Sequence, residues 1–468
     1  MKSLKTFGVF ILFVLFLSLV SCAEETPVSN ETDSKSDTGE EVSQVQQEDS
    51  NILLNEAGKR IITLGTWYDI YYVSKHDDIN DDPQLLNPET AQMRLDRMRE
   101  VEKKYNIELR YVNLTFDGIQ ESINTSILAG DPDVDIYEVD IKFGIPAVLK
   151  GYCVSLEDME LQDTDVFTTQ DVFKYLRLME QDQTYLFTPT NIGAVNAYVL
   201  AFNMDMINAA GLDNPQDLYD RGEWTWSKWK EYLGTLTQDT NHDGKIDIYG
   251  FSGYWIQLLA NLLLSNGTGI ASGEHETLSS SETYEVLDFI NSMYNIDNTA
   301  RPWDDSNWSI NNELYSSGLS AFWIGADWLF NEQGGADLPF EIGVVPWPCG
   351  PSGDFETNRH STPQTKWYMI PNGVSNPRLV YDVIFDWINW YNGDISVGVN
   401  LDWSRSMYMS ERNFEYAMLM DSRPGFDLWE NLGVDFNLTT MMKGDMRPND
   451  VVERYGNLYQ NALDNYFN

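Results

Sequence analysis

The sequence predicts an α/β protein, and three observations support this prediction. Strand-like and helix-like segments alternate between residues 60 and 139, which is the order found in a parallel sheet covered by helices. The second half adds amphipathic helices with short apolar strands between them. The chain has 468 residues, of which 42% are hydrophobic, so it is long enough for two or three domains with large cores.

The first half contains the clearest strand and helix patterns. Residues 60–66 form an apolar, β-branched run, and residues 107–111 alternate apolar with charged side chains, as strands do. Leu95, Met98 and Val101 share one face of a helical segment that Asn106 is placed to end. We expect strands at 60–66, 107–111 and 134–139, with helices at 88–105 and 119–128.

The second half is richer in helical patterns. Its tryptophans at helical spacing are expected to pack in cores, as most large aromatic residues do: Trp224, Trp226, Trp229, Trp387 and Trp390. Short apolar runs between the helical segments indicate strands. We expect helices at 224–236, 255–264, 281–294 and 378–390, with strands at 321–324 and 342–345.

The N-terminus has the pattern of an export signal. Lys2 and Lys5 precede an apolar run at 7–17, and small residues lead to Cys22. A cysteine at the cleavage site resembles a bacterial lipobox, in which the thiol is lipidated, with palmitate among the acyl groups. The alternatives are an ordinary signal peptide or an N-terminal membrane anchor, although a spanning helix needs about 20 apolar residues. We expect 1–22 to be a lipoprotein signal and the protein to be held on the outer face of the cytoplasmic membrane.

Residues 23–56 are rich in Ser, Thr, Asp, Glu and Gln and contain no aromatic residue. Such a segment buries too little apolar surface to offset the entropy lost on ordering. We therefore expect a disordered tether, with an r.m.s. reach of about 30–35 Å.

The charge and cysteine content limit the partners. The net charge is −43, and loss of Lys2 and Lys5 with the signal makes it −45. That charge repels phosphate backbones and anionic lipid heads, so we expect no nucleic-acid partner and contact with the membrane only through the lipid. Cys153 and Cys349 remain; an export compartment permits a disulfide, and the sequence leaves open whether they meet.

Four segments of the chain match known sequence motifs. Residues 130–136 are similar to a G-x-x-P-D entry into a strand, and residues 198–205 to L-x-Y-N-K-D, with Phe202 for Tyr and Met204 for Lys. The third segment runs from 223 to 250, and the fourth covers 318–346 with 375–377. By their order and spacing over 57–400, these segments together resemble the bacterial extracellular solute-binding proteins (family 1) of carbohydrate ABC transporters.

The resemblance implies a type II periplasmic-binding-protein-like fold, in which two hinge-linked α/β lobes enclose a ligand cleft. Crossing strands near 190–200 and 340–345 would form the hinge. We expect 57–192 with 341–392 as the N-terminal lobe and 193–340 with 393–468 as the C-terminal lobe. The implied function is capture of a sugar by cleft closure and its delivery to ABC permease subunits, by a monomer that is not an enzyme.

The third segment contains a calcium-like loop. Its residues match the opening of an EF-hand loop, with Gly244 at the turn and Gly250 where the usual bidentate Glu stands. We expect a structural calcium ion of modest affinity; the alternative is an Asx-rich turn without metal. The expected ligands are Asp239, Asn241, Asp243, Lys245 (through its carbonyl) and Asp247.

A sugar site needs aromatic faces for the rings and planar polar groups for the hydroxyls. Residues that follow predicted strands meet at one edge of a parallel sheet, where ligands of such sheets bind. The resemblance adds that the position of Trp328 stacks on the sugar in related proteins. The candidate ligand-binding residues are Trp67, Tyr68, Asp69, Asp140, Asn196, Asn203, Tyr254, Trp255, Asp327, Trp328 and Trp367.

Two other functions stay open. A secreted glycoside hydrolase has the same acidic, tryptophan-rich composition, and pairs such as Asp304 and Asp305 are present. However, the sequence has no Gly-x-Ser-x-Gly, His-Glu-x-x-His or P-loop motif. The other alternative keeps the fold but binds a peptide or another solute.

Overall fold

A computed structural model describes residues 52–467 apart from 73–74, 83–84, 86–87, 160–166, 169–183, 190–196, 273, 308, 333–337, 362–366, 395–396, 398–400 and 426. Cys22, the predicted tether up to residue 51 and Asn196 therefore lie outside the described residues. Residues 52–56 are described, and the Leu53 carbonyl accepts a hydrogen bond of 2.8 Å from the Ile61 amide. No helix in the described part is long and apolar enough to cross a membrane.

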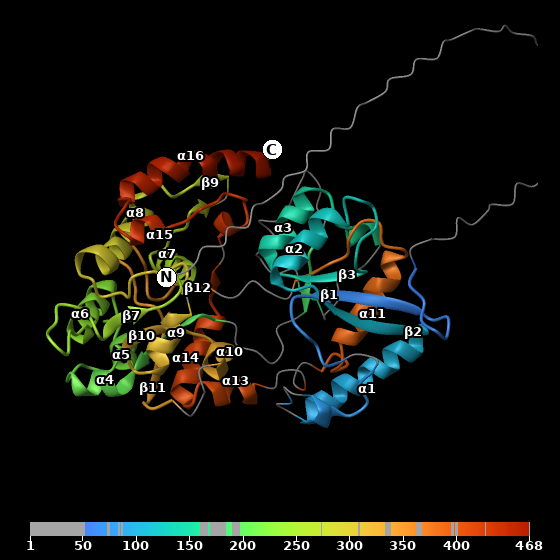
Figure 1. Cartoon of the computed structure of the whole chain (residues 1–468), viewed down its shortest axis with the longest axis horizontal. Helices are drawn as coiled ribbons and strands as arrows, with labels where there is room; N and C mark the ends of the chain where they lie inside the picture. The colour runs from blue at the N-terminus through green and yellow to red at the C-terminus, as the bar shows by residue number, and fades with distance from the viewer. Residues whose placement is uncertain are drawn as a thin grey trace, which may run out of the picture. The chain divides into compact units, whose positions relative to one another are not determined.

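The first sheet is built mainly from the N-terminal part of the chain (Figure 1). β1 is central and pairs in parallel with β2 and β3, while β13 from the C-terminal part pairs antiparallel with β3. The strands in spatial order are β13 (Trp367–Met369), β3 (Ile136–Val139), β1 (Arg60–Thr66) and β2 (Ile107–Asn113).

Helices pack on this sheet through apolar stripes. In α1, Leu95, Met98 and Val101 are buried, and the helix packs against α11 and β2. Asn106 ends α1 in the left-handed region, with φ 53°. We call this sheet and its helices the first lobe; the helices are α1 (Pro88–Tyr105), α2 (Phe116–Thr125), α3 (Ile141–Leu149) and α11 (Pro377–Ile388).

The second sheet comes from the middle of the chain, and we call it with its helices the second lobe. β6 is antiparallel to both of its neighbours, β10 and β11, whereas β10 and β7 are parallel. The strands in spatial order are β11 (Ile342–Val345), β6 (Val199–Asn203), β10 (Ser320–Gly325) and β7 (Tyr249–Ser252).

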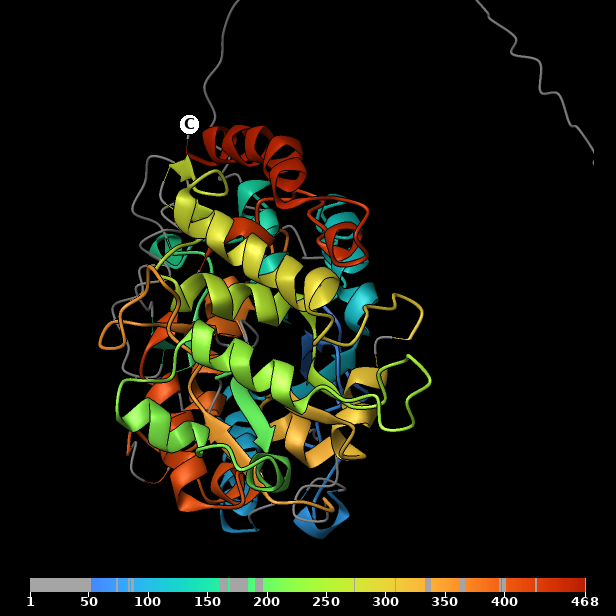
Figure 2. The same ribbon diagram turned by 90° about the vertical axis from the view of Figure 1, so that its left-hand side faces the viewer.

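Most of the remaining helices cover the second lobe. α6 packs on β7, α5 and α14 pack on β11, and α8 contacts both α7 and α16 (Figure 2). These helices are α4 (Met204–Ala209), α5 (Pro215–Asp220), α6 (Trp226–Leu236), α7 (Trp255–Ser265), α8 (Ser281–Asn291), the π-helical turn Ser292–Ile296, α9 (Ile310–Ser316), α10 (Asp327–Glu332), α13 (Asp402–Met407), α14 (Glu411–Asp421), α15 (Thr439–Met442) and α16 (Pro448–Phe467).

Short elements complete the described chain. β12 and β14 form a parallel pair, whereas β4 with β5 and β8 with β9 are antiparallel. Their bounds are β4 (Phe167–Thr168), β5 (Thr188–Pro189), β8 (Ala271–Ser272), β9 (His275–Glu276), β12 (His360–Ser361) and β14 (Pro424–Gly425), with the 3-10 helices η1 (Ile79–Asp81), η2 (Glu157–Met159) and η6 (Leu428–Glu430).

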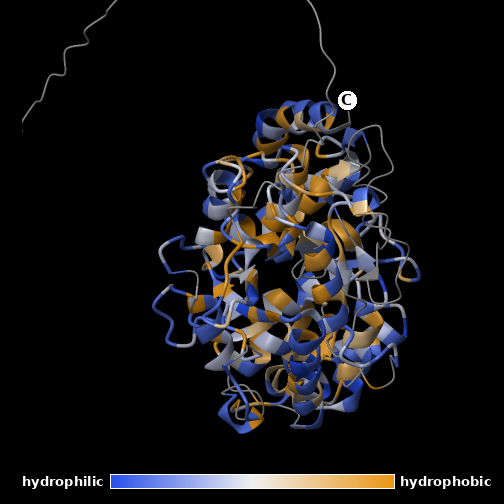
Figure 3. Ribbon diagram, turned by 90° about the vertical axis from the view of Figure 1, so that its right-hand side faces the viewer, coloured by the Kyte–Doolittle hydropathy of each residue, from blue (hydrophilic) through white to orange (hydrophobic). Residues whose placement is uncertain are grey.

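Four of the five predicted core tryptophans are buried, and the fifth is half-buried. Trp224, Trp226 and Trp229 are buried in the second lobe, and Trp390 is also buried. Trp387 is half-buried on α11 and packs with Tyr111 at a ring-centroid distance of 5.7 Å. The outer loops are mostly hydrophilic (Figure 3), as expected for a folded chain with this acidic composition.

The predicted strands at 60–66 and 342–345 and the predicted helix at 88–105 are confirmed with the expected bounds. The helix expected at 119–128 instead begins at Phe116. The reason is the cap at Thr115, whose Oγ1 accepts from the Gly118 amide at 3.2 Å.

Two further findings concern the lobes. β11 pairs with β6 of the second sheet and β12 packs on α7, so residues 342–361 belong to the second lobe, and the chain is back in the first lobe at β13, not at residue 341 as we expected. Cys153 lies beside Pro371 in the first lobe, while Cys349 lies beside Thr225 in the second lobe. Both thiols are free and buried, which answers the question that the sequence left open.

Candidate functional site

A row of aromatic rings follows the carboxyl ends of the first-lobe strands. Trp67 comes directly after β1, Phe116 opens α2 after β2, and Phe143 lies in α3 after β3. The ring centroids of Trp67 and Phe116 are 6.2 Å apart, and those of Phe116 and Phe143 are 5.1 Å apart. The Lys142 Nζ lies 4.4 Å from the Phe116 ring centroid. This set, the first-lobe wall, offers ring surface and a cation where parallel-sheet proteins bind ligands.

Tyr68 and Asp69, the two candidate residues next to Trp67, point away from the aromatic row. The Tyr68 hydroxyl donates to Glu138 Oε1 at 2.5 Å, beneath the end of the sheet. Asp69 is exposed, and its Oδ1 accepts from Asn113 Nδ2 at 3.1 Å. Trp67 is therefore the member of the triplet whose side chain joins the aromatic row.

Asp140 directly follows β3 and is the N-cap of α3. Its Oδ1 accepts from the Lys142 amide at 3.0 Å, which satisfies one of the free donors of the helix N-terminus. Burial raises the pKa of this carboxyl, and the nearby Lys142 charge and backbone hydrogen bond oppose the rise. Asp140 thus carries a carboxylate next to the first-lobe wall.

A second group of aromatic rings opens α7 in the second lobe. Tyr254 and Trp255 are half-buried at the helix start, and Trp303 is half-buried beside them. Ring-centroid distances are 6.4 Å for Tyr254 with Trp303 and 6.3 Å for Trp255 with the buried Trp429. Phe436 supports Trp255 at the same distance of 6.3 Å. We call this set the second-lobe wall.

Residues from both lobes influence the pKa of the Tyr198 hydroxyl. Tyr198 stands directly before β6, and its pKa is raised first by burial and then by the negative charges of Asp140 and Glu430. Interaction with Gln257 of α7 lowers this pKa in part, and Tyr254 raises it slightly. The electrostatic neighbours of one hydroxyl thus come from the end of β3, from α7 and from η6.

Glu430 is an exposed residue whose carboxyl is nevertheless crowded by protein. Desolvation raises its pKa to about 7, and the negative charges of Asp140 and Asp427 add to the rise against the opposing effect of Lys142. Solvent reaches part of this side chain and screens its charge. A carboxyl with a raised pKa beside an aromatic surface is typical of functional sites.

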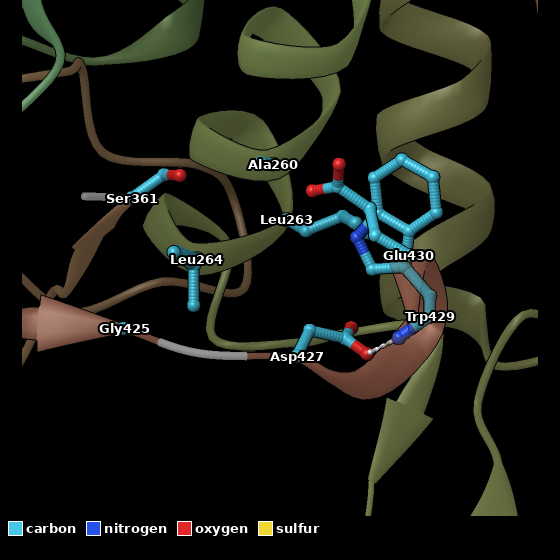
Figure 4. A pocket seen from close by; sticks show the side chains of 8 residues that line it. All are labelled: Ala260, Leu263, Leu264, Ser361, Gly425, Asp427, Trp429 and Glu430. Atoms are coloured by element: carbon cyan, nitrogen blue, oxygen red, sulfur yellow. Dashed lines mark hydrogen bonds between the residues drawn. The ribbon is translucent and has the colours of Figure 1, made fainter. Parts of the chain in front are cut away.

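Behind Glu430 lies a small pocket of about 20 Å³, room for about one water molecule. Figure 4 shows Asp427 at the lower edge of the pocket, with its hydrogen bond from the Trp429 amide. The same carboxylate also accepts from the backbone amides of Ile270 and Ala271. Burial raises the pKa of Asp427 to about 6. The pocket is too small for a sugar. The hydrogen bonds of Asp427 fix the loop that carries Glu430. Its lining residues are Ala260, Leu263, Leu264, Ser361, Gly425, Asp427, Trp429 and Glu430.

The remaining predicted ligand residues lie elsewhere. Asn203 is buried and caps α4 through its Oδ1, and Trp367 is buried opposite Val139 in β13. Asp327 is buried and accepts from Ser404 Oγ at 2.8 Å, whereas Trp328 next to it is 42% exposed. The structure brings Trp67, Asp140, Tyr254 and Trp255 into the two walls and their junction, and Trp328 presents an exposed ring on α10.

The calcium-like loop is held by its own side chains. Asp239 Oδ2 accepts from the Gly244 amide at 2.8 Å, and Asp243 Oδ1 accepts from the Lys245 amide at 2.9 Å. Asp247 Oδ2 accepts from the Thr240 amide and hydroxyl at 2.8 and 2.6 Å. Within the described chain, no three His, Cys, Asp or Glu side chains converge to hold a metal ion. The loop thus has the turn that an EF-hand requires, and calcium stays a prediction.

Sequence reasoning missed several residues of the walls and their junction. Phe116 and Lys142 come within five residues of the ends of two predicted strands, so the rule that selected Trp67 and Asp140, applied to a slightly longer stretch, could have found them. Tyr198 opens the 198–205 segment that carries part of the family resemblance, but only the residues after it match the motif. Trp303 lies in a loop and Glu430 ends η6, and no local pattern marks either as a site residue. Their grouping depends on tertiary structure.

Comparison with solved structures shows the fold. The chain is similar to an ABC substrate-binding protein from Listeria monocytogenes in complex with cycloalternan (14% identity, 86% of this chain and 99% of that chain covered, TM-score 0.59). It is equally similar to the GacH receptor of Streptomyces glaucescens, solved unliganded and with acarbose (14%, 87% and 99%, 0.58). UgpB from Mycobacterium tuberculosis in complex with glycerophosphocholine also matches (14%, 80% and 96%, 0.57).

No match is found among curated protein sequences. A family profile, in contrast, matches residues 57–395, which is well over half of the chain. The profile describes bacterial extracellular solute-binding proteins, whose two-lobe α/β fold agrees with the two sheets found here. This chain belongs to the family of bacterial extracellular solute-binding proteins.

Proposed function

We propose that the protein captures a carbohydrate between its two aromatic walls and delivers it to an ABC importer. The observation that carries this proposal is the pair of aromatic walls: Trp67 and Phe116 follow strands of the first sheet, and Tyr254 with Trp255 opens α7 of the second lobe. Half-buried rings flanked by carboxylates suit the apolar faces and hydroxyl groups of sugar rings. The similar solved structures that contain cycloalternan and acarbose support a carbohydrate as the ligand.

The mechanism is a shift between open and closed lobes. A sugar that stacks on Trp67 or Phe116 and also on Trp255 makes its full contacts only when the lobes approach each other. Binding then shifts the population toward the closed state in proportion to the extra affinity of that state. The permease subunits of the importer would recognise the closed form.

Calorimetry against two panels tests this function. The mature protein is titrated with maltotriose, cellotriose, xylotriose and their longer homologues, and separately with tripeptides and glycerophosphocholine. We expect one oligosaccharide class to bind at one molecule per protein, with no product on chromatography. Binding of peptides alone would refute the carbohydrate proposal. Hydrolysis of an oligosaccharide in the panel would favour the alternative of a glycoside hydrolase, since the catalytic acid of a glycosidase also has a raised pKa.

The lipid anchor is a separate proposal that rests on Cys22 and the apolar run before it. Expression of the full chain in a bacterial host should place it in the membrane fraction. Cys22→Ser is expected to move it to the soluble extracytoplasmic fraction with its fold unchanged. An unchanged distribution of the variant would refute lipidation at this residue.

We also propose that calcium stabilises the 239–247 loop, because the loop already makes the EF-hand turn. At 2 mM calcium and an affinity near 1 mM, the linked stabilisation is about 0.6 kcal/mol, or a rise in Tm of about 1 °C. Magnesium at the same concentration should have a smaller effect, and Asp243→Asn should abolish the calcium response. No calcium-dependent rise in wild-type protein would refute the metal site.

A further inference from the structure

Beneath the first-lobe wall, one buried carboxylate holds two tyrosine hydroxyls. Glu138 lies on β3 and is 3% exposed. Its Oε1 accepts from the Tyr68 hydroxyl at 2.5 Å, and its Oε2 accepts from the Tyr368 hydroxyl at 2.9 Å. Among the described residues, no Lys or Arg forms an ion pair with it. Two charge-assisted hydrogen bonds therefore replace the water that this carboxylate loses on folding.

The two tyrosines are held in different ways. Tyr368 lies on β13, directly opposite Glu138 in the antiparallel pair, and its ring stacks on the buried Phe187 at 6.0 Å. Tyr68 lies in the loop after β1, and its ring contacts Trp67 edge-on at 5.7 Å. The sheet and the core thus fix Tyr368, whereas Tyr68 reaches the core through its hydroxyl.

The protonation states are consistent with this arrangement. Burial, followed by the charge and hydrogen bonds of Glu138, raises the pKa of both tyrosines far above the ordinary value. Both phenols therefore stay protonated and donate at physiological pH. The loop has two other attachments, from Thr66 Oγ1 to the Tyr68 carbonyl at 2.6 Å and from Asn113 to Asp69. Neither of them acts on the side chain that packs against Trp67.

We infer that Glu138 is a positioning residue for ligand binding: by holding the Tyr68 hydroxyl, it sets the orientation of Trp67 in the first-lobe wall. Trp67 makes edge-on contacts with the rings of Tyr68 and Phe116, at 5.7 and 6.2 Å, so the position of the Tyr68 ring bears directly on it. The inference rests on the proposed function only for its consequence, which is ligand affinity. The positioning itself concerns the unliganded protein.

The test compares Tyr68→Phe with Tyr368→Phe. Each variant removes one hydrogen bond from the same carboxylate, so each should lower Tm by a similar amount, about 2 °C. The full chain is labelled with 5-fluorotryptophan, and Trp67→Phe assigns the Trp67 resonance. We expect Tyr68→Phe to shift that resonance and to weaken binding of the best oligosaccharide from the calorimetry panel about fivefold. Tyr368→Phe should change neither.

The inference is overturned if Tyr68→Phe leaves the Trp67 resonance in place, or if Tyr368→Phe shifts it equally. Glu138→Gln serves as the conservative variant, because the amide keeps the side-chain volume and one acceptor oxygen. It should shift the same resonance by less than Tyr68→Phe does. If wild-type protein binds no sugar in the panel, the proposed function fails, while the resonance still decides the role of Glu138.

Discussion

Replacing Trp255 with alanine is expected to weaken oligosaccharide binding by about thirtyfold or more, since buried aromatic anchors are worth 2 kcal/mol or more at binding sites. Trp255 opens α7, and the buried rings of Trp429 and Phe436 support it from behind at 6.3 Å. A supported ring loses little conformational entropy when a sugar stacks on it. The expected loss is therefore in affinity, measured by calorimetry, more than in Tm.

Trp387→Ala is the matched control. Trp387 is also a half-buried helical tryptophan with an aromatic neighbour, but it lies on α11 of the first lobe beside Tyr111. Its removal should lower Tm by a similar amount and leave sugar affinity unchanged. Equal losses of affinity in both variants, or none in Trp255→Ala, would remove the second-lobe wall from the binding site.

Glu430→Gln is expected to raise thermal stability at pH 8 and to leave it nearly unchanged at pH 4.5. The pKa of Glu430 is about 7 in the folded protein against an ordinary value of 4.5. The folded state therefore holds this proton more tightly than the unfolded state, so ionisation disfavours folding. The cost is absent below pH 4.5, grows between pH 4.5 and 7, and is complete above pH 7. Asp427, with a pKa of about 6 against 3.8, adds a cost of the same sign at lower pH.

Scanning calorimetry from pH 4.5 to 8 measures this effect. After allowance for solvent screening of the exposed Glu430, the variant should gain about 3 °C in Tm at pH 8 and almost nothing at pH 4.5. Glu453→Gln, at an exposed position on α16, controls for the loss of one negative charge. A gain of the same size at both pH values, or in both variants, would contradict the assignment of a raised pKa to Glu430.

The sequence predicted the main strands and helices of this protein well, because local residue patterns determine where they begin and end. The bounds of β1 follow from a β-branched run, and those of α1 follow from Pro88, the buried stripe and Asn106. The start of α2 was predicted late, because Thr115 caps it from a left-handed position with φ 63° that periodicity does not reveal. The fourth strand of the first sheet, β13, comes from 367–369 and could not be placed without tertiary contacts.

The candidate site was predicted only in part, because local patterns reveal strand ends but not the tertiary contacts around them. Trp67 and Asp140 follow strands, so their meeting at one sheet edge was foreseeable. Asn203 follows a strand too, but its side chain caps α4 inside the core, a role that strand position alone does not distinguish. Glu430 acts on Tyr198 and Asp140 across more than 200 residues of chain, and only the fold brings these groups together.

The most direct test of the proposed function is co-elution. The mature protein is mixed with a pool of oligosaccharides, passed over a desalting column, denatured and examined by mass spectrometry. We predict one intact oligosaccharide per protein molecule, lost in Trp255→Ala and retained in Trp387→Ala. Recovery of shortened sugars, or of no sugar from a protein that retains peptides from a parallel pool, would contradict its assignment as a carbohydrate receptor.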